Sequence, residues 1–494
     1  MTAIELQTLK TMKFRGVFFA LLICTFGATA QDYQAINGSP YAGSMGVANN
    51  PATILSTPYP WDITVFSVQV KNTTNAITFT NLSYLTHGDT LGYSWTNGPL
   101  KRYASFNYNV HLLNVRLALD RKQAISFGAN LRGYGSVRTG VVNYNDTLQD
   151  MNQFFSINEG NSYQASVVSS SWLELYGTYS RTMWDDEYGR LNAGVTLHAM
   201  RGISGAYAQL TNGAVRRNAL DSTTIYSLAG GKAIYGYSAN YDLWHNNNST
   251  TKNLNDFLTH TQGGAAIDLG VEYLVKSQNV HVFGDEDDYY DYEWKLGAAL
   301  MDIGANMYDY GIESRAVSNP KTTTSDIDLN EKFNYVKSFA AFNDSLATVV
   351  NTMTKLRGHF RIWNPARLVL NVDRPLPNHF ALNTELTLNL GGNNMGQRLF
   401  TKEITLLAVT PRWETRRLGG YLPITVTTDG KVWIGGAFKA GPLLLGFHNW
   451  GDVFSKSKSQ NGGFYLALVI RPGKGGFSFK EPKEYTCPKN GTVK

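Results

Sequence analysis

The stretch that decides the fold runs from Val110 to Val137 and reads Val110-His-Leu-Leu-Asn-Val-Arg-Leu-Ala-Leu119, Asp120-Arg-Lys-Gln123 and Ala124-Ile-Ser-Phe-Gly-Ala-Asn-Leu-Arg-Gly-Tyr-Gly-Ser-Val137. Apolar residues alternate with small or polar residues on both sides of the link at 120–123. This period of two predicts two β-strands, and the short link predicts an antiparallel hairpin. A polar second face is typical of barrel strands whose apolar face meets lipid and whose other face lines a wet lumen.

The same alternation recurs along most of the chain, for example at 191–200, 266–275, 294–305, 379–390 and 464–471. Short links at 120–123, 184–189 and 374–378 alternate with long connections at about residues 139–170, 209–263 and 306–364. Short turns at one end and long loops at the other are typical of outer-membrane barrels. We find about fifteen candidate strands, and because such barrels have an even number we predict about 14. We expect the false candidate in the N-terminal pair at 62–71 and 76–85.

Composition agrees with this class of protein. Charged residues make up 17% of the chain, against about 25% in typical soluble domains. Aromatic residues make up 13%, and most tryptophans lie near predicted strand ends, where an aromatic girdle belongs. These are Trp61, Trp172, Trp184, Trp294, Trp363, Trp413, Trp433 and Trp450. The alternative is that they are ordinary aromatic residues between loops and core.

The N-terminus has the pattern of an export signal. Lys13 and Arg15 precede an apolar run at 16–27, and Ala28-Thr29-Ala30 follows it, which predicts a signal peptide at residues 1–30. Cys487 is then the only cysteine left, so no internal disulfide is expected. We divide the rest into a plug segment at 31–60, an outer-membrane β-barrel at 61–472 and a flexible periplasmic tail at 473–494.

The sequence lacks the common catalytic and cofactor-binding motifs. It contains no phosphate-binding glycine loop, no zinc-protease motif and no serine-nucleophile elbow, so we expect no enzyme, no cofactor and no metal. The acidic run at 285–293 is read as a solvated turn, although carboxylates also suit a divalent cation. The net charge of +6 forms no basic stripe, and we expect no nucleic-acid partner.

Several charged residues fall on the polar face of the predicted strands. They have two interpretations: opposite charges that pair across a filled interior, or a polar throat that selects solutes. His198 is read mainly as a solvated lumen side chain rather than a catalytic one. The lumen-facing candidates are Arg116, Arg132, His198, Asp268, Glu272, Arg367 and Glu385.

Short motifs resemble a known superfamily. Ala48-Asn-Asn-Pro-Ala52 and the stretches at 266–273 and 296–304 are similar to the FadL/TodX and PorV-type outer-membrane β-barrels. The stretches at 410–415 and 436–446 resemble an uncharacterised subgroup of them. The resemblance implies an all-β fold, a transmembrane antiparallel barrel with long extracellular loops. It also implies that the N-terminal plug lies in the lumen, with Asn50, Pro51 and Ala52 matching the plug motif.

The expected function follows from this resemblance and from the plug-like N-terminus. We expect a passive, FadL-like channel for a small hydrophobic solute in the outer membrane of a Gram-negative bacterium, surrounded by outer-membrane lipid. The alternative is a PorV-like accessory or anchor barrel that assists a secretion or surface-attachment machinery and binds a protein partner of that machinery.

The signal peptide and the alternating loop lengths also assign the two faces of the opening hairpin. The lipid-facing side chains are predicted to be Leu113, Val115, Leu117, Ile125, Phe127 and Leu131. The lumen-facing side chains are predicted to be Asn114, Arg116, Asn130 and Arg132.

Overall fold

The structure is a computed structural model that describes residues 33–80, 92–220, 223–245, 247–276, 291–334, 336–392, 398–428, 430–454 and 458–472. The predicted signal peptide, the predicted tail and most of the acidic run at 285–293 lie outside these residues. Within them, no helix is long and apolar enough to cross a membrane.

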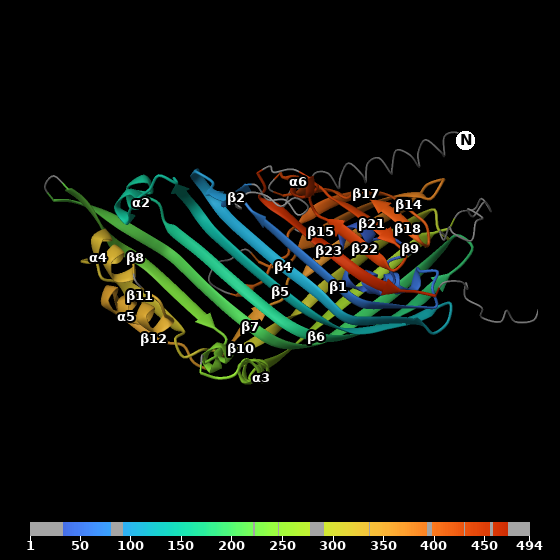
Figure 1. The fold of residues 1–494 in the computed structure, drawn as a ribbon, viewed down its shortest axis with the longest axis horizontal. Coiled ribbons are helices and arrows are strands. Elements are labelled where there is room, and N and C mark those ends of the chain that lie inside the picture. Colours follow the sequence, from blue (N-terminus) through green and yellow to red (C-terminus); the bar gives the residue numbers. More distant parts are fainter. Residues whose placement is uncertain are drawn as a thin grey trace, which may run out of the picture.

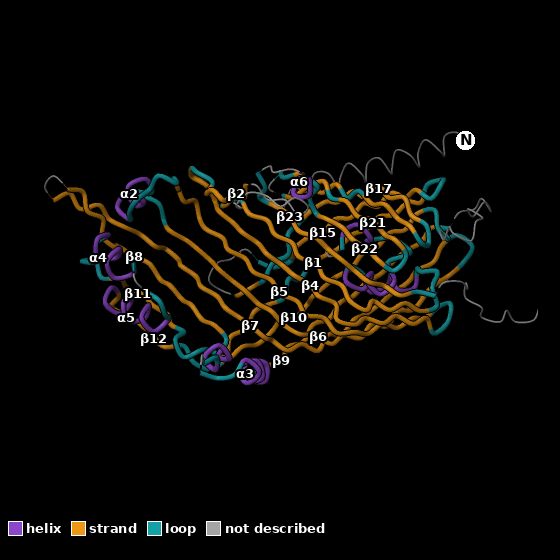
Figure 2. The backbone as a smooth tube through the Cα atoms, in the orientation of Figure 1, coloured by secondary structure: helices purple, strands orange, loops and turns teal. Residues whose placement is uncertain are grey.

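The chain forms a closed antiparallel β-barrel of fourteen wall strands (Figures 1 and 2). Closure is direct, because β1 pairs with β4 on one edge and with the last strand, β23, on the other. Three wall strands are interrupted, so that β13 with β14, β18 with β19, and β20 with β21 each form one line. The wall consists of β1 (Trp61–Thr74), β4 (Gly98–Ala118), β5 (Gln123–Tyr144), β6 (Tyr163–Asp185), β7 (Gly189–Leu220), β9 (Gln262–Val275), β10 (Trp294–Asp309), β13 (His359–Trp363), β14 (Arg367–Pro375), β15 (Phe380–Asn389), β17 (Leu406–Glu414), β18 (Leu418–Tyr421), β19 (Ile424–Thr427), β20 (Val432–Ile434), β21 (Gly436–Ala440), β22 (Leu443–Phe447) and β23 (Asn461–Ile470).

The opening hairpin is β4 and β5, and its predicted faces are confirmed. Leu113 is 50% exposed and Phe127 is 47% exposed on the outside of the barrel. Arg116 and Arg132 are buried on the inside. The two strands pair from Ala118 with Ala124 up to Gly98 with Tyr144, with small shifts of register near His111 and Arg102. Apolar side chains outside and polar side chains inside are the arrangement of a barrel that spans a lipid bilayer.

The predicted strand at 76–85 is wrong as a wall strand. Only Ile77–Thr80 is extended (β2), and it pairs with β3 (Gly92–Trp95) in a separate hairpin beyond the wall. The remaining part, 81–85, lies outside the described residues. The place beside β1 is taken by β4, which pairs with β1 over most of its length and leaves no edge for a second N-terminal strand. The predicted count of 14 strands is therefore confirmed, with the extra candidate identified.

The two ends of the barrel differ, and we name them the short-turn end and the long-loop end. At the long-loop end, β7 continues past the wall and carries an extension of the sheet, seen projecting at the left of Figure 1. This extension consists of β8 (Thr223–Tyr237), β11 (Arg315–Pro320) and β12 (Val350–Lys355). Helical segments border the same end: α2 (Met151–Ile157), η4 (Ala239–Leu243), α3 (Thr250–Thr259), α4 (Asp326–Phe333), α5 (Phe339–Val349) and α6 (Gly451–Phe454).

Residues 33–60, the plug, lie inside the barrel toward the short-turn end (Figures 1 and 2). Their backbone forms three short 3-10 helices, η1 (Gln34–Ile36), η2 (Gly43–Ala48) and η3 (Pro51–Leu55). Tyr33, Ile36 and Met45 of the plug pack with Tyr465 and Leu444 of the wall in one buried cluster. The fold thus places the N-terminal segment in the lumen, as the predicted fold class requires.

The predicted tryptophan girdle is only partly present. Trp184 is 47% exposed at the short-turn end and stacks on Tyr273 of β9. Trp172 and Trp433 instead lie buried within the barrel, which corrects the prediction for both. Trp172 lies on the inward face of β6, in regular alternation with Ser170 and Glu174, and its indole Nε1 donates to Glu174 Oε2 at 2.9 Å.

Candidate functional site

The plug motif holds η3 against two wall strands. Asn50 is the N-cap of η3: its Oδ1 accepts from Ala52 N at 2.9 Å, and its Nδ2 donates to the Val271 carbonyl of β9 at 3.0 Å. Pro51 takes the first helical position, where its fixed φ suits a helix and its missing N–H is not needed. The Pro51 carbonyl accepts from Ser180 Oγ of β6 at 2.7 Å. Asn50, Pro51 and Ala52 therefore form a short cap fixed to the wall.

Two glycines of the wall make room for this cap. A Cβ atom at Gly194 of β7 would lie 2.7 Å from Ala52 N, and one at Gly270 of β9 would lie 2.1 Å from Asn50 Oδ1. Both distances are shorter than any side-chain carbon can adopt, so the plug backbone reaches the wall only where side chains are missing. Small residues on the inward face, read from the sequence as the lining of a wet lumen, here receive the plug.

Buried cations of the wall bind carbonyl groups of the plug. Arg116 donates to the carbonyls of Ile54 at 2.6 Å and Tyr59 at 2.7 Å. Lys295 Nζ donates to the Gly38 carbonyl at 2.6 Å, and Arg367 Nη2 donates to the Ala48 carbonyl at 2.8 Å. Short 3-10 helices leave terminal carbonyls without partners of their own. The cations supply those partners and join the plug to three separate strands.

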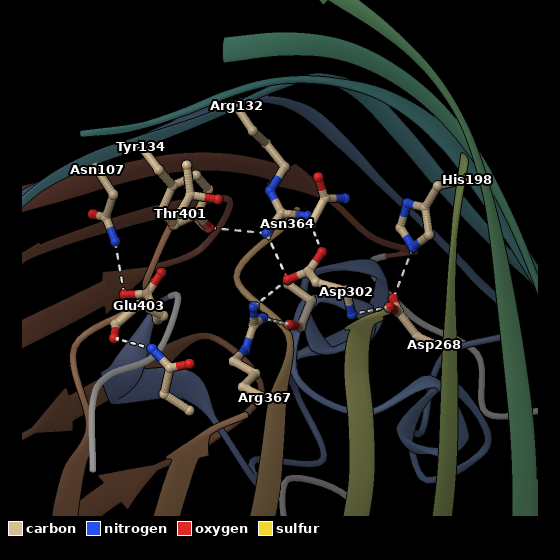
Figure 3. Close-up of polar contacts among 12 residues, drawn as sticks. Asn107, Arg132, Tyr134, His198, Asp268, Asp302, Asn364, Arg367, Thr401 and Glu403 are labelled. Atoms are coloured by element: carbon tan, nitrogen blue, oxygen red, sulfur yellow. Dashed lines mark hydrogen bonds and ion pairs between the residues drawn. The ribbon is translucent and has the colours of Figure 1, made fainter. Parts of the chain in front are cut away.

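A charged network lies directly beside the plug, and Asp302 of β10 is its centre (Figure 3). Its carboxylate accepts from Arg132 at 2.6 and 2.9 Å and also from Arg367 Nη1. The Asp302 backbone N–H donates to Asp268 Oδ1 at 2.6 Å, and Asp268 Oδ2 lies 2.8 Å from His198 Nε2. All five residues are buried, so each charge depends on its partners rather than on water.

Asp302 has a left-handed backbone, with φ of 59°, at a bulge in the pairing of β9 with β10. Residues other than glycine rarely adopt this region, although aspartate and asparagine are among the more tolerant. The bulge matters for the site because Leu296 and Leu300 face outward, and strict alternation would direct Asp302 outward as well. The bulge turns the carboxylate into the lumen, which is why alternation alone missed this residue.

All seven lumen-facing candidates from the sequence lie in the barrel interior, but they do not form one site. Arg132, His198, Asp268 and Arg367 meet in the network around Asp302. Arg116 lies 3.5 Å from Asp62, and Glu272 lies 3.6 Å from Lys295 and accepts from Ser56 of the plug. Glu385 accepts from Asn371 at 3.0 Å and from Asn37 of the plug at 3.4 Å. Opposite charges thus pair across a filled interior, and solute selection by these residues stays a prediction.

Sequence reasoning missed further members of the interior. Glu174 of β6 accepts from Asn130 at 2.9 Å and lies 3.6 Å from Arg132. Asp373 of β14 binds Arg412 of β17 through two contacts of 2.6 and 2.9 Å. Both acids lie on the inward face of alternating strands, so a consistent count of inward positions would have found them.

An inner loop, residues 399–405, closes the lumen from the long-loop end. It begins as β16 (Leu399–Phe400), which runs parallel to β13, and Thr401 N donates to the Trp363 carbonyl at 3.0 Å. Glu403 accepts from Asn107 of β4 at 2.7 Å (Figure 3). It also lies 3.7 Å from Lys71 of β1. The loop therefore spans the lumen from β13 to β1 and β4.

The interior is filled at the level of the plug and hollow beyond it. Two cavities beside the plug measure about 20 Å³ each, which is room for about one water molecule. A third cavity, above the inner loop at the long-loop end, measures about 450 Å³. The plug and the network thus separate this hollow end from the short-turn end.

The fold and the lumen define a class of protein: a transmembrane β-barrel closed by an N-terminal plug. The chain belongs to a family of unknown function, DUF5723, whose sequence model matches residues 51–448. None of the curated proteins compared with the chain matches it.

Solved structures similar to this chain include three barrels. A FadL homologue from Pseudomonas aeruginosa is 11% identical with a TM-score of 0.40, covering 90% of this chain and 99% of its own. The toluene transporter TodX of P. putida is 13% identical with a TM-score of 0.35, covering 90% and 97%. The toluene transporter TbuX of Ralstonia pickettii is 10% identical with a TM-score of 0.38, covering 89% and 100%. The predicted resemblance to FadL- and TodX-type barrels is confirmed, and its PorV part stays a prediction.

Proposed function

We propose that this protein is a passive channel in the outer membrane of a Gram-negative bacterium, with the plug as its gate. The observation that carries the proposal is the division of the lumen: a non-covalently held plug stands between the short-turn end and an open cavity of about 450 Å³. In this orientation the long-loop end is extracellular and the short-turn end periplasmic. Displacing the plug, together with the inner loop at 399–405 that forms the floor of this cavity, would join the two sides.

The small hydrophobic solute predicted from the sequence is the substrate we assign to this channel. An aromatic cluster near the extracellular end supports it. Phe360 lies 4.8 Å from Tyr310, 5.3 Å from Tyr207 and 5.4 Å from Tyr308 between ring centroids. Tyr207, Tyr308 and Phe360 are buried against one another, so a solute that enters between the long loops gains apolar contact with them only when the cluster opens.

A disulfide between plug and wall tests the gate. Ser44 Oγ of the plug and Thr64 Oγ1 of β1 lie 2.9 Å apart, so cysteines at both positions are within bonding reach. In a Cys487→Ser background, Ser44→Cys/Thr64→Cys is expected to conduct in planar bilayers when reduced and to close when oxidised. Uptake of toluene by intact cells is expected to follow the same pattern.

The single variants Ser44→Cys and Thr64→Cys are the matched controls and should not respond to oxidant. A variant without residues 31–60 should conduct in both redox states. Equal conductance and equal uptake in the oxidised, reduced and plug-less proteins would remove the gating proposal.

A second function, the accessory or anchor barrel, is favoured by the extension at the long-loop end. Ile312, Ile327 and Phe339 are each 56% exposed there, well beyond the lipid-facing wall. Exposed apolar side chains outside a membrane are typical of protein contacts. Affinity purification from native membranes distinguishes the two functions: a stoichiometric partner that is lost from an Ile327→Ser/Phe339→Ser variant supports the anchor, and a lone barrel contradicts it.

A further inference from the structure

The cavity above the inner loop, which we call the vestibule, has an unusual lining. Its wall comes from the extracellular parts of β4, β5, β6 and β7, and its floor is the inner loop. A volume of about 450 Å³ lies within the range of about 300–1,000 Å³ usual for small-molecule sites. The vestibule belongs neither to the plug contacts nor to the network around Asp302.

Positive charge dominates the described residues of this lining. Its one carboxylate, Glu403, is already engaged by Asn107 and lies beside Lys71. A cleft with charges of one sign and low-dielectric walls focuses its field and concentrates ions of the opposite sign. The cationic lining residues are Lys101, Arg102, Arg138, Arg398 and Lys402.

Arg102 of β4 shows that the site is built rather than a chance gathering of surface cations. Its side chain is almost fully buried, and its two Nη atoms donate to the carbonyls of Thr96 at 2.5 Å and Gly98 at 2.9 Å. The guanidinium also lies 5.5 Å from the ring centroid of Tyr144. These contacts fix its position, while its Nε is buried and makes no hydrogen bond within the described structure. A buried donor left without a partner is costly unless something accepts from it.

The uncharged part of the lining is rich in hydroxyl and amide groups, and apolar side chains are few. Such groups donate and accept, so they suit the hydroxyls of a ligand as well as its anionic group. The hydroxyl and amide residues include Ser105, Ser136, Thr139, Ser166, Gln209 and Thr405.

We propose that the vestibule is a binding site for a small, hydroxyl-rich organic anion, of the class of sugar phosphates and sugar acids. The guanidinium and ammonium groups bind the oxyanion, and the hydroxyl and amide groups bind the polyol part. The proposal concerns binding at the extracellular end and does not depend on the plug acting as a gate.

Isothermal titration calorimetry on the full-length protein in detergent tests the site. Glucose 6-phosphate and gluconate are expected to bind, neutral glucose is not, and the affinity should fall as salt is added. Arg138→Gln/Lys402→Gln is expected to weaken binding by about tenfold or more, because charged contacts to an oxyanion are lost. Lys252→Gln, which removes an exposed lysine on α3, is the matched control and should bind as the wild type does.

Two results would overturn the proposal: equal heats for glucose and glucose 6-phosphate, or an unchanged affinity in the double variant. If inorganic phosphate binds as tightly as glucose 6-phosphate, the proposed contacts of the hydroxyl and amide groups with the polyol part of the ligand are contradicted. Heat-modifiable migration on a gel shows whether each variant is folded. Because no transport is measured, failure here leaves the channel proposal intact, and failure of the disulfide test leaves this site intact.

The pH dependence gives a second readout. Burial and the neighbouring Arg138 lower the pKa of Lys402, in the connection before β17, to about 8. Lys402 is therefore charged at pH 7 and largely neutral at pH 9, so gluconate affinity is expected to fall over this interval. Lys402→Gln should remove this dependence, and a wild-type affinity that rises with pH would contradict the assignment. The other charged groups around the vestibule are Lys101, Arg102, Arg138, Arg398 and Glu403.

Discussion

Replacing Asp302 by asparagine is expected to lower the free energy of unfolding by about 3–5 kcal/mol, the usual loss when one partner of a buried ion pair is removed. The variant leaves Arg132 and Arg367 buried without their shared carboxylate. Asparagine tolerates the left-handed backbone at this position, so the change isolates the charge from the fold of the bulge. Urea unfolding in detergent micelles, followed by heat-modifiable migration, measures the loss.

Two control variants show whether the loss of stability comes from the buried charge. Asp256→Asn removes an exposed carboxylate paired with Lys252 on α3 and is expected to leave the urea midpoint unchanged. Asp302→Asn/Arg367→Met also removes one of the two guanidinium groups that share the Asp302 carboxylate, so its loss should be smaller than the sum of the losses of the single variants. An Asp302→Asn protein as stable as the wild type would show that the network does not hold the lumen together.

Replacing Leu197 by arginine is expected to destabilise the barrel by about 2–4 kcal/mol, the cost of a lipid-facing cation near the middle of the bilayer. Leu197 of β7 is 62% exposed on the outside of the wall, opposite Gly177 of β6 and Ile267 of β9. It lies well above Trp184 at the short-turn end, so a long side chain cannot reach water there without disturbing lipid. Folding into vesicles across a urea series measures this cost.

Leu117→Arg is the matched comparison. The sequence predicts that Leu117 faces lipid, and the structure confirms this, but it pairs with Trp61 at the very start of β1. At such an interface position the expected cost is only about 0–1 kcal/mol. Equal costs at Leu197 and Leu117 would mean that the membrane crosses the barrel at a different height.

Much of the wall could be predicted because alternation is a local property. The period of two around Leu117 and Phe127 gives the strands, their faces and the approximate strand count. The plug could be predicted only from the resemblance at Asn50-Pro51-Ala52, because a Gly-, Asn- and Pro-rich segment has no period of its own. Its location in the lumen depends on partners such as Ser180 and Val271, which lie far along the chain.

The rest of the site escaped prediction for a physical reason. Asp302 faces inward because a bulge breaks the alternation just before it, and single-sequence patterns do not locate such irregularities. Glu403 lies in no wall strand, and its role arises from a loop that folds back into the barrel. The vestibule arises only when cations from two wall strands and one loop are brought together.

The seat of the plug has a consequence for the order of assembly. The backbone carbonyl of Tyr41 in the plug accepts a hydrogen bond at 2.8 Å from Arg471, which directly follows the last wall strand. Tyr41 and Arg471 are 430 residues apart in the sequence. Tyr33 packs at 6.1 Å against Tyr465 of that same strand. Contacts over such separations form late, since the intervening chain must first be ordered. The first segment of the described chain therefore takes up its position in the lumen only after the last strand has closed the barrel. A plug bound in the lumen thus indicates that the barrel is fully assembled.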